Sequence, residues 1–181
     1  NRPPERMSSR ELKEAQEKLG SLINTAESSL DRLYLAVGKV GCCVVLADAN
    51  GVAVDRRGAT ADDKTFREWG LWTGSLWSED SEGTNGIGTC IVEKRALTIH
   101  KEQHFHSKNT SLSCSAAPIF DHEGKLIAAI DVSSSRADLT AEFARVISMS
   151  VVDAARHIES EHFRQTFFDA DIILASQPQG Q

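Results

Sequence analysis

Two pairs of apolar runs, each joined by a short turn, constrain the fold of this chain more than any other feature. In the first pair, GCCVVLAD and VAVDRRG flank Ala49, Asn50 and Gly51. In the second pair, LSCSAAPIFD and KLIAAIDVSS flank the turn HEG. Apolar runs joined by a few residues that include glycine are typical of β-hairpins. The chain is therefore expected to build an antiparallel sheet.

Long helical patterns lie at both ends of the chain. One long helix is predicted over residues 8–38, because apolar side chains recur there in alternating steps of four and three, at Leu19, Ile23, Ala26, Leu30, Leu33 and Val37. A second is predicted over residues 139–168, with an apolar stripe of Phe143, Ile147, Val151, Ala154 and Ile158. Hairpins with segregated helices predict an α+β fold, with a central antiparallel sheet of five to six strands flanked by helices.

The charge balance and the cysteines narrow the class of protein. The 26 acidic and 20 basic side chains give a formal net charge of −6, whereas nucleic-acid-binding surfaces are basic and clustered. No run approaches the roughly 20 apolar residues of a membrane span, and the N-terminal segment lacks the apolar core of a secretory signal. The four cysteines form no C-x-x-C pair. They are expected to be reduced, buried thiols of a cytoplasmic protein, with a redox role as the alternative.

The stretch GTNGIGTC, residues 83–90, is the first candidate for a binding site. Its glycines do not fit the dinucleotide spacing G-x-G-x-x-G, and no parallel βαβ unit surrounds them. We expect Thr84 to be the N-cap of a short helix whose free N–H groups would suit an oxygen-bearing ligand. Asn85 offers both a donor and an acceptor, and Trp77 is expected to form a pocket wall. The alternative is a structural turn, with Trp77 in the core.

Several polar side chains extend this candidate site. His100, His104 and His106 have a spacing that crosses a strand end and a loop without a second ligand pair, so we predict no metal site, although Cys114 could join one. His104 is expected to form a hydrogen bond in the pocket, or to be an exposed loop residue. Asp131 interrupts an apolar strand, and its neighbours point to the other face. It is expected to face outward or to be buried with partners, and contact with a ligand is the sharper hypothesis.

Three of these segments together resemble the GAF sensor domain of the acetoin-catabolism and dihydroxyacetone-type activators. The segments are LWSEDSEGTNGIGTCIVEKRALTI, EQHF and LSCSAAPIFDHEGKLIAAIDVS, and the resemblance runs from about Leu30 to Ile158. Those activators are bacterial enhancer-binding proteins that work with sigma-54 RNA polymerase. The resemblance implies a ligand-sensing input domain that acts with an ATP-driven AAA+ domain and a helix-turn-helix. The phosphate loop G-x-x-x-x-G-K-[ST] does not occur in this sequence, so this chain is not expected to hydrolyse ATP by that route. No DNA-reading helix is evident either, so contact with DNA is expected only through domains absent from this sequence.

The resemblance also implies the kind of ligand. The expected effector is a small organic molecule such as a hydroxyketone, a diol or an alcohol, with no cofactor, no metal and no membrane partner. The residues expected to bind it are Trp77, Thr84, Asn85, His104, Cys114 and Asp131. We divide the chain into an N-terminal signalling and dimerisation helix (1–39), a GAF sensing core (40–139), a C-terminal signalling helix (140–168) and a linker tail (169–181). A homodimer through the terminal helices is expected.

Two other functions stay open. The free methionine sulfoxide reductases are enzymes that use the GAF fold and work through cysteines, and Cys90 and Cys114 could serve in this way. No activated nucleophile with a neighbouring base is legible in the sequence, however, so we predict no catalytic residue and no enzyme activity. The other alternative is a dimerisation module that binds no ligand.

Overall fold

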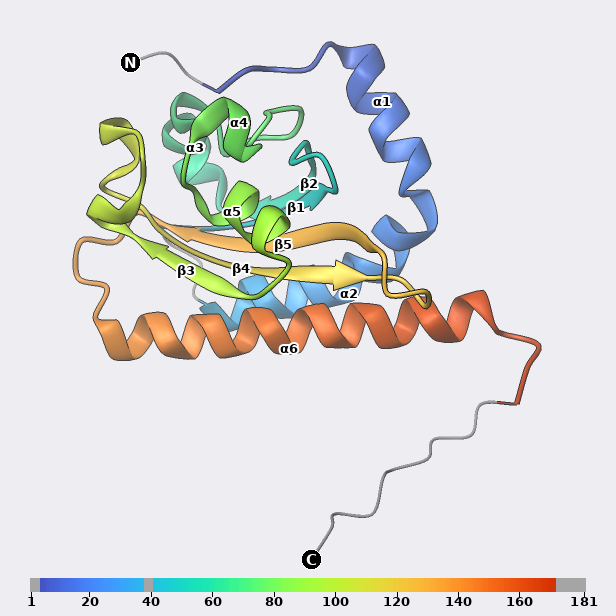
Figure 1. The fold of residues 1–181 in the computed structure, drawn as a ribbon. Coiled ribbons are helices and arrows are strands. Elements are labelled where there is room, and N and C mark those ends of the chain that lie inside the picture. Colours follow the sequence, from blue (N-terminus) through green and yellow to red (C-terminus); the bar gives the residue numbers. More distant parts are fainter. Residues whose placement is uncertain (1–3, 38–40, 172–181) are drawn as a thin grey trace, which may run out of the picture.

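A five-stranded antiparallel sheet lies between two layers of helices in the computed structural model, which describes residues 4–37 and 41–171 (Figure 1). The strands are β1 (Cys42–Asp48), β2 (Ala53–Gly58), β3 (Leu97–His100), β4 (Ser113–Phe120) and β5 (Leu126–Ser134). Their order across the sheet is β2-β1-β5-β4-β3. Both expected hairpins are present, β1 with β2 and β4 with β5. The α+β prediction is confirmed.

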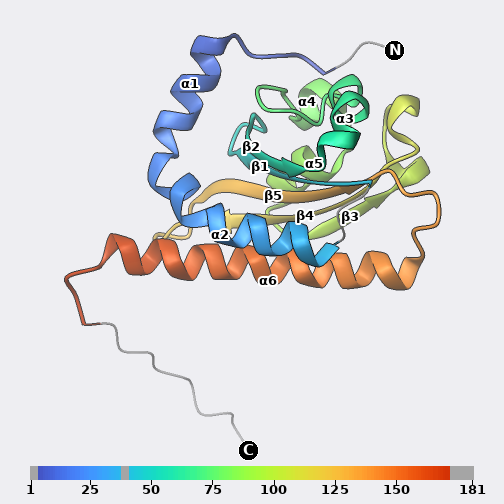
Figure 2. The ribbon, with the colours of Figure 1, turned by 180° about the vertical axis from the view of Figure 1, so that it is seen from behind.

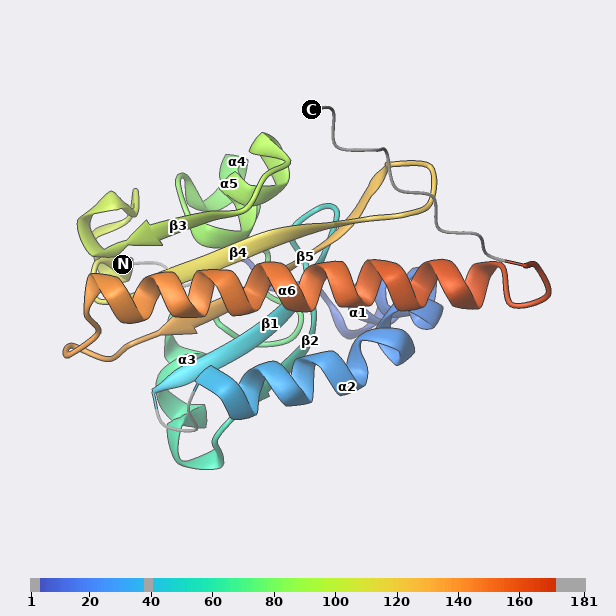
Figure 3. The ribbon, with the colours of Figure 1, turned by 90° about the horizontal axis from the view of Figure 1, so that it is seen from below.

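Two helices cover one face of the sheet. Helix α2 (Gly20–Val37) lies beside the long helix α6 (Ala141–Thr166), as the views from behind and from below show (Figure 2, Figure 3). The single helix predicted over residues 8–38 is wrong, because α1 (Ser9–Lys18) ends before α2 begins. Leu19 leaves the helical conformation there, and the next residue, Gly20, has a low helix propensity. Helix α1 connects the two helical layers (Figure 1).

The opposite face of the sheet carries short helices and loops. Helices α3 (Asp63–Trp69), α4 (Glu79–Glu82) and α5 (Gly86–Glu93) lie there, with the 3₁₀ turns η1 (Thr60–Asp62), η2 (Lys101–Gln103) and η3 (Ser107–Asn109). The N-terminal segment joins this layer, since the N–H of Met7 donates to the Gly74 carbonyl at 2.7 Å and that of Leu76 donates to the Glu5 carbonyl at 2.8 Å.

Alternate residues of the strands fill two separate cores. On β1, Val44 and Leu46 pack towards α2 and α6, whereas Cys43, Val45 and Ala47 pack towards α3 and α5. Both faces of this strand are therefore buried, which explains why its sequence is continuously apolar rather than alternating. The apolar stripes of α2 and α6 belong to the first core, apart from Phe143, which is exposed.

The proposed division of the chain stays a prediction. Helices α2 and α6 both pack on the sheet that they flank. The predicted linker tail beyond residue 171 lies outside the described residues.

Candidate functional site

Asp131 is a buried acid at the centre of the sheet. It lies on β5, the middle strand, opposite Val45 of β1 and Ala116 of β4, and is 1% exposed. Its neighbours Ile130 and Val132 pack into the core under α2 and α6, so Asp131 faces the layer of α3 and α5. The predicted alternation along this strand is confirmed, and of the alternatives for Asp131 the outward-facing one is wrong.

A chain of buried polar groups runs from Asp131 to the loop after β3. Asp131 Oδ2 is hydrogen-bonded to Ser133 Oγ at 2.6 Å, and Ser133 Oγ to Cys114 Sγ at 3.1 Å. Cys114 Sγ lies 3.4 Å from His104 Nε2, and His104 Nδ1 lies 2.9 Å from the carbonyl oxygen of Lys101. The structure thus brings together three of the six predicted site residues: His104, Cys114 and Asp131.

One atom of this polar chain is left over. Asp131 Oδ1 is fully buried and has no hydrogen-bond partner among the residues that the structure describes. A buried polar atom without a partner is costly, and such atoms are rare in folded proteins. The atom points to the start of α5, where a Cβ added to Gly86 would lie 2.7 Å from it.

Burial controls the protonation of these groups. It raises the pKa of Asp131 to about 7, an effect opposed by the hydrogen bond from Ser133. It also raises the pKa of the Cys114 thiol, as does the nearby Asp131 carboxyl. The pKa of His104 is lowered, because burial disfavours the imidazolium. Each shift favours the neutral form of its group.

The glycine stretch is a tight structural turn. Asn85, not Thr84, is the N-cap of α5, so the prediction for Thr84 is wrong by one residue: Asn85 Oδ1 accepts from the N–H of Gly88 at 2.9 Å. The Asn85 amide also donates to the carbonyl oxygens of Gly83 at 2.8 Å and Trp77 at 3.2 Å. The side chain of Asn85 is therefore already engaged on both its oxygen and its nitrogen.

Trp77 belongs to the core on the same side of the sheet. It is buried, and its Nε1–H donates to the Gly70 carbonyl at 2.9 Å. Its neighbour Trp72 has a different role, since its ring lies between the guanidinium groups of Arg56 and Arg67, at 4.1 and 4.0 Å from the ring centre. Trp77 is therefore a core residue whose apolar ring packs next to the glycine turn.

The loop that carries His104 is fastened to the glycine turn. The N–H of Phe105 donates to the Thr84 carbonyl at 3.0 Å, and Lys108 Nζ lies 3.0 Å from Glu82 Oε2. The side chain of Glu82 is only 6% exposed, so this ion pair is largely shielded from water. Together, the loop and the turn cover the polar chain. Sequence reasoning missed Glu82, Lys108 and Ser133.

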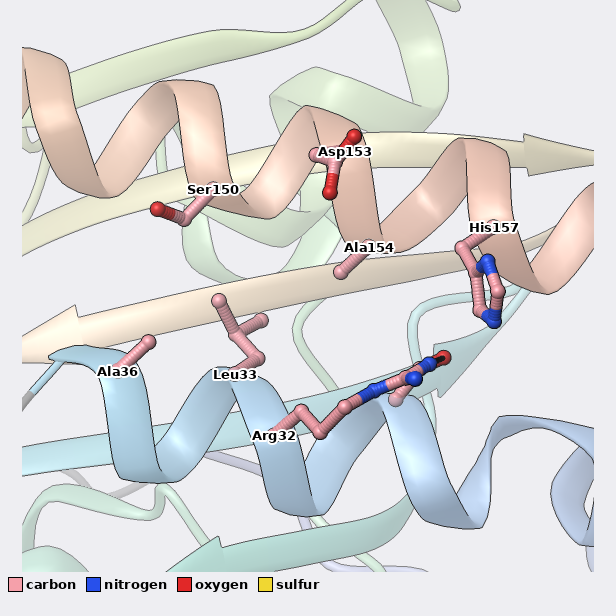
Figure 4. Close-up of a pocket in the computed structure, with 8 residues that line it drawn as sticks. Arg32, Leu33, Ala36, Ser150, Asp153, Ala154 and His157 are labelled. Atoms are coloured by element: carbon pink, nitrogen blue, oxygen red, sulfur yellow. Dashed lines mark hydrogen bonds between the residues drawn. The ribbon is translucent and has the colours of Figure 1, made fainter.

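A groove lies on the other side of the sheet, between α2 and α6. It has a volume of about 350 Å³ and is lined by Arg32, Leu33 and Ala36 of α2 and by Ser150, Asp153, Ala154 and His157 of α6, with Ser29 (Figure 4). None of the six predicted site residues lines this groove.

No group of three or more His, Cys, Asp or Glu side chains that could hold a metal ion occurs within residues 4–37 and 41–171. Over the same ranges, every helix is too short or too polar to cross a membrane. All four cysteines are free and buried.

Comparison with known proteins places these features in context. The model of the GAF domain family matches residues 21–158. The acetoin catabolism regulatory protein of Cupriavidus necator is 36% identical over 152 residues, which cover 84% of this chain and 23% of that protein. The acetoin dehydrogenase operon transcriptional activator AcoR of Bacillus subtilis is 28% identical over 130 residues, which cover 72% of this chain and 22% of that protein. This chain spans less than a quarter of the length of either relative.

Among solved structures, the Escherichia coli DhaR(N)–DhaL complex contains a similar chain. The match has a TM-score of 0.83 at 15% sequence identity and covers 93% of this chain and 56% of that one. At this identity, the likeness supports the fold alone.

Proposed function

Because the chain belongs to the GAF domain family and is homologous to the sensor domains of transcriptional activators, we propose that it binds a small organic effector and relays the binding to the rest of a regulator. The effector class follows from the relatives' names, which refer to acetoin, a molecule with one hydroxyl and one carbonyl group. Action in the cytoplasm, with a sigma-54 polymerase, is part of this proposal.

One observation carries the proposal: the unpartnered oxygen of Asp131. A buried acceptor without a donor is satisfied when a ligand brings a hydroxyl group to it. It lies on the face of the sheet whose apolar core holds Trp77 and Ile87, and small-molecule sites combine apolar walls with a few polar groups of this kind. We assign direct contact with the effector to Asp131, Cys114 and His104, and wall contact to Trp77.

Thr84 and Asn85 have a supporting role in this proposal. Since the amide of Asn85 is engaged by the turn, an effector that reached it would have to break the cap of α5. The turn also lies against Asp131 so closely that a single added carbon at Gly86 would not fit. Effector entry therefore requires the turn to move outward. A ligand that binds only the open form shifts the population towards that form, which is the physical basis of a signal.

The relay is proposed to end in a homodimer through the terminal helices. Val146 and Met149 lie three residues apart on α6, are 55% and 73% exposed, and so place neighbouring apolar surface on the helix that borders the groove. The groove carries Arg32 on α2 and Asp153 on α6 (Figure 4). In an isologous contact with a second copy related by a two-fold axis, Arg32 of each copy would face Asp153 of the other.

The alternative enzyme function lacks chemical support. Burial raises the pKa of Cys90 to about 12 and also raises that of Cys114. Both groups are therefore thiols at neutral pH, whereas cysteine catalysis uses the thiolate. Together with relatives that are transcriptional regulators, this favours a sensor without catalysis.

The test is isothermal titration calorimetry with acetoin on the wild type and on Asp131→Ala. We expect binding to the wild type, and a loss of about fivefold or more in affinity when one hydrogen bond of about 1 kcal/mol is removed. Asp48→Ala is the matched control, because Asp48 is also a buried acid on the sheet but holds the β1–β2 turn. A wild type that binds neither acetoin nor related diols and hydroxyketones would overturn the proposal.

A further inference from the structure

The polar chain from His104 to Asp131 has only a few ways to place its hydrogens. The Lys101 carbonyl oxygen can only accept, so the contact of 2.9 Å with His104 requires a proton on Nδ1. Each of the remaining three contacts, His104–Cys114, Cys114–Ser133 and Ser133–Asp131, needs one hydrogen between its two heavy atoms. Ser133 and Cys114 supply one hydrogen each, which leaves one contact to be served by Asp131 or by His104.

Two arrangements satisfy every contact. In the first, a protonated Asp131 donates to Ser133, Ser133 donates to Cys114, and Cys114 donates to a neutral His104. In the second, His104 carries both ring protons and donates to Cys114, which donates to Ser133, which donates to an ionised Asp131. The two differ by the shift of one hydrogen in each of the three contacts, so a proton passes from Asp131 to His104 and the total number of protons stays the same.

Every other arrangement contains a defect. If Asp131 is ionised while His104 is neutral, one contact of the chain has no hydrogen. If both are protonated, one contact has two hydrogens that face each other. We infer that His104, Cys114, Ser133 and Asp131 share a single proton as a buried relay, and that this proton resides on Asp131 rather than on His104, so that the site accepts an uncharged hydroxyl group rather than a cation.

The surroundings of the relay support the neutral arrangement. The groups around Asp131 are Gly86 at the start of α5, the thiols of Cys43, Cys90 and Cys114 on neighbouring elements, and Ser133 on its own strand. None of these brings a positive charge to the carboxyl, and burial shifts the pKa of both ends towards the neutral form. In the second arrangement, by contrast, a positively charged His104 and a negatively charged Asp131 would both be buried away from water.

The ligand class follows from the position of the proton, and this step rests on the proposed function. When Asp131 is protonated on Oδ2, the free Oδ1 is a carbonyl oxygen that accepts from a hydroxyl. An ammonium group would instead favour the ionised carboxylate and so move the proton to His104. The relay thereby connects the ligand site to the loop of His104, which is fastened to the glycine turn.

The first experiment is long-range ¹H–¹⁵N correlation NMR of the histidine rings, with the His104 signals assigned by their loss in His104→Gln. At pH 7 we expect a neutral ring with the proton on Nδ1 and none on Nε2. We expect the same spectrum for Asp131→Asn, because the amide donates to Ser133 and keeps a carbonyl at the place of Oδ1. A doubly protonated His104 in the wild type would overturn the placement of the proton on Asp131, and a ring that changes its protonation in Asp131→Asn would overturn the relay.

The second experiment tests the ligand class with two probes that differ in one group. Ethylene glycol and ethanolamine are titrated into the wild type at pH 7, with acetoin as the reference. We expect the glycol to bind at least about tenfold more tightly than the protonated amine. Equal or preferred binding of ethanolamine would refute the ligand class while the NMR result stands. Binding of none of the three would overturn the proposed function, again without affecting the relay.

Discussion

The close approach of α5 to Asp131 can be tested by adding one methyl group at Gly86. A Cβ at this position would lie 2.7 Å from Asp131 Oδ1 and 2.7 Å from Cys114 Cβ, closer than carbon atoms in proteins approach either type of atom. Both neighbours are buried on the sheet and are fixed by the polar chain, so neither moves freely. We therefore expect Gly86→Ala to push α5 away from the sheet.

The expected change in the free energy of unfolding of Gly86→Ala is the sum of two opposing effects. Overpacking of a well-packed core costs roughly 1–3 kcal/mol. Replacing glycine by alanine in a helix gains at most about 1 kcal/mol, and less at the first residue. Gly20→Ala is a matched control, because Gly20 is also the first residue of its helix but has no atom within 4 Å of an added Cβ. The control should gain a few tenths of a kcal/mol to about 1 kcal/mol, so the two variants should differ by roughly 1–3 kcal/mol.

Urea unfolding followed by circular dichroism measures both variants against the wild type. Gly86→Ala should unfold at a lower urea concentration with an unchanged slope, and Gly20→Ala at the same or a higher one. The reasoning is refuted if Gly86→Ala is as stable as Gly20→Ala, since the turn would then have room that the structure does not give it. In that case the start of α5 could not act as a close-fitting cover over Asp131.

Three further predictions concern the cap, the buried acid and the helices. Asn85→Ala should cost about 1 kcal/mol or more in urea unfolding, because the N-cap is lost and two carbonyls lose a donor, whereas equal losses in Thr84→Ala would contradict the assignment of the cap. The pKa of Asp131 is raised from 3.8 to about 7, so the folded state binds the extra proton and stability falls as the pH rises between these values. Asp131→Asn should therefore gain stability relative to the wild type across this window in urea titrations, and a constant difference would argue against the shift. Met149→Lys should shift the mass in light scattering from dimer to monomer, while Val92→Lys, at an exposed position of α5, should not; a monomeric wild type would contradict this prediction.

Features with a local period were predictable from the sequence. The hairpins, the apolar stripes of the long helices and the alternation of side chains around Asp131 all depend on neighbours within a few residues, and the structure agrees with them apart from the exposed Phe143. Ser133 could have been found by the same rule, because it lies two residues after Asp131 and so faces the same side of the strand.

Other features depend on contacts that no local pattern contains. The choice of Asn85 over Thr84 as the N-cap depends on the direction in which the chain enters α5, where Gly83 has a φ of 61° that favours glycine. The Glu82–Lys108 ion pair joins residues far apart in the sequence, and the fully engaged amide of Asn85 was visible only once Trp77 was placed beside it. The break between α1 and α2 depends on the step from one helical layer to the other.

The two-sided packing of β5 decides how a signal from the buried acid can reach the helices. Asp131 faces α5, while Ile130 and Val132, directly beside it on the same strand, face α2 and α6. A strand in the middle of a sheet cannot shift on one face only, so a ligand that displaces the β5 backbone at Asp131 also moves the apolar surface under both helices. The carboxylate of Glu159 on α6 accepts from the N–H of Phe120 at 2.8 Å and so joins that helix to the end of β4. The C-terminal half of α6 is therefore attached to the same hairpin that carries the acid, and this attachment makes α6 the expected route to the rest of the regulator.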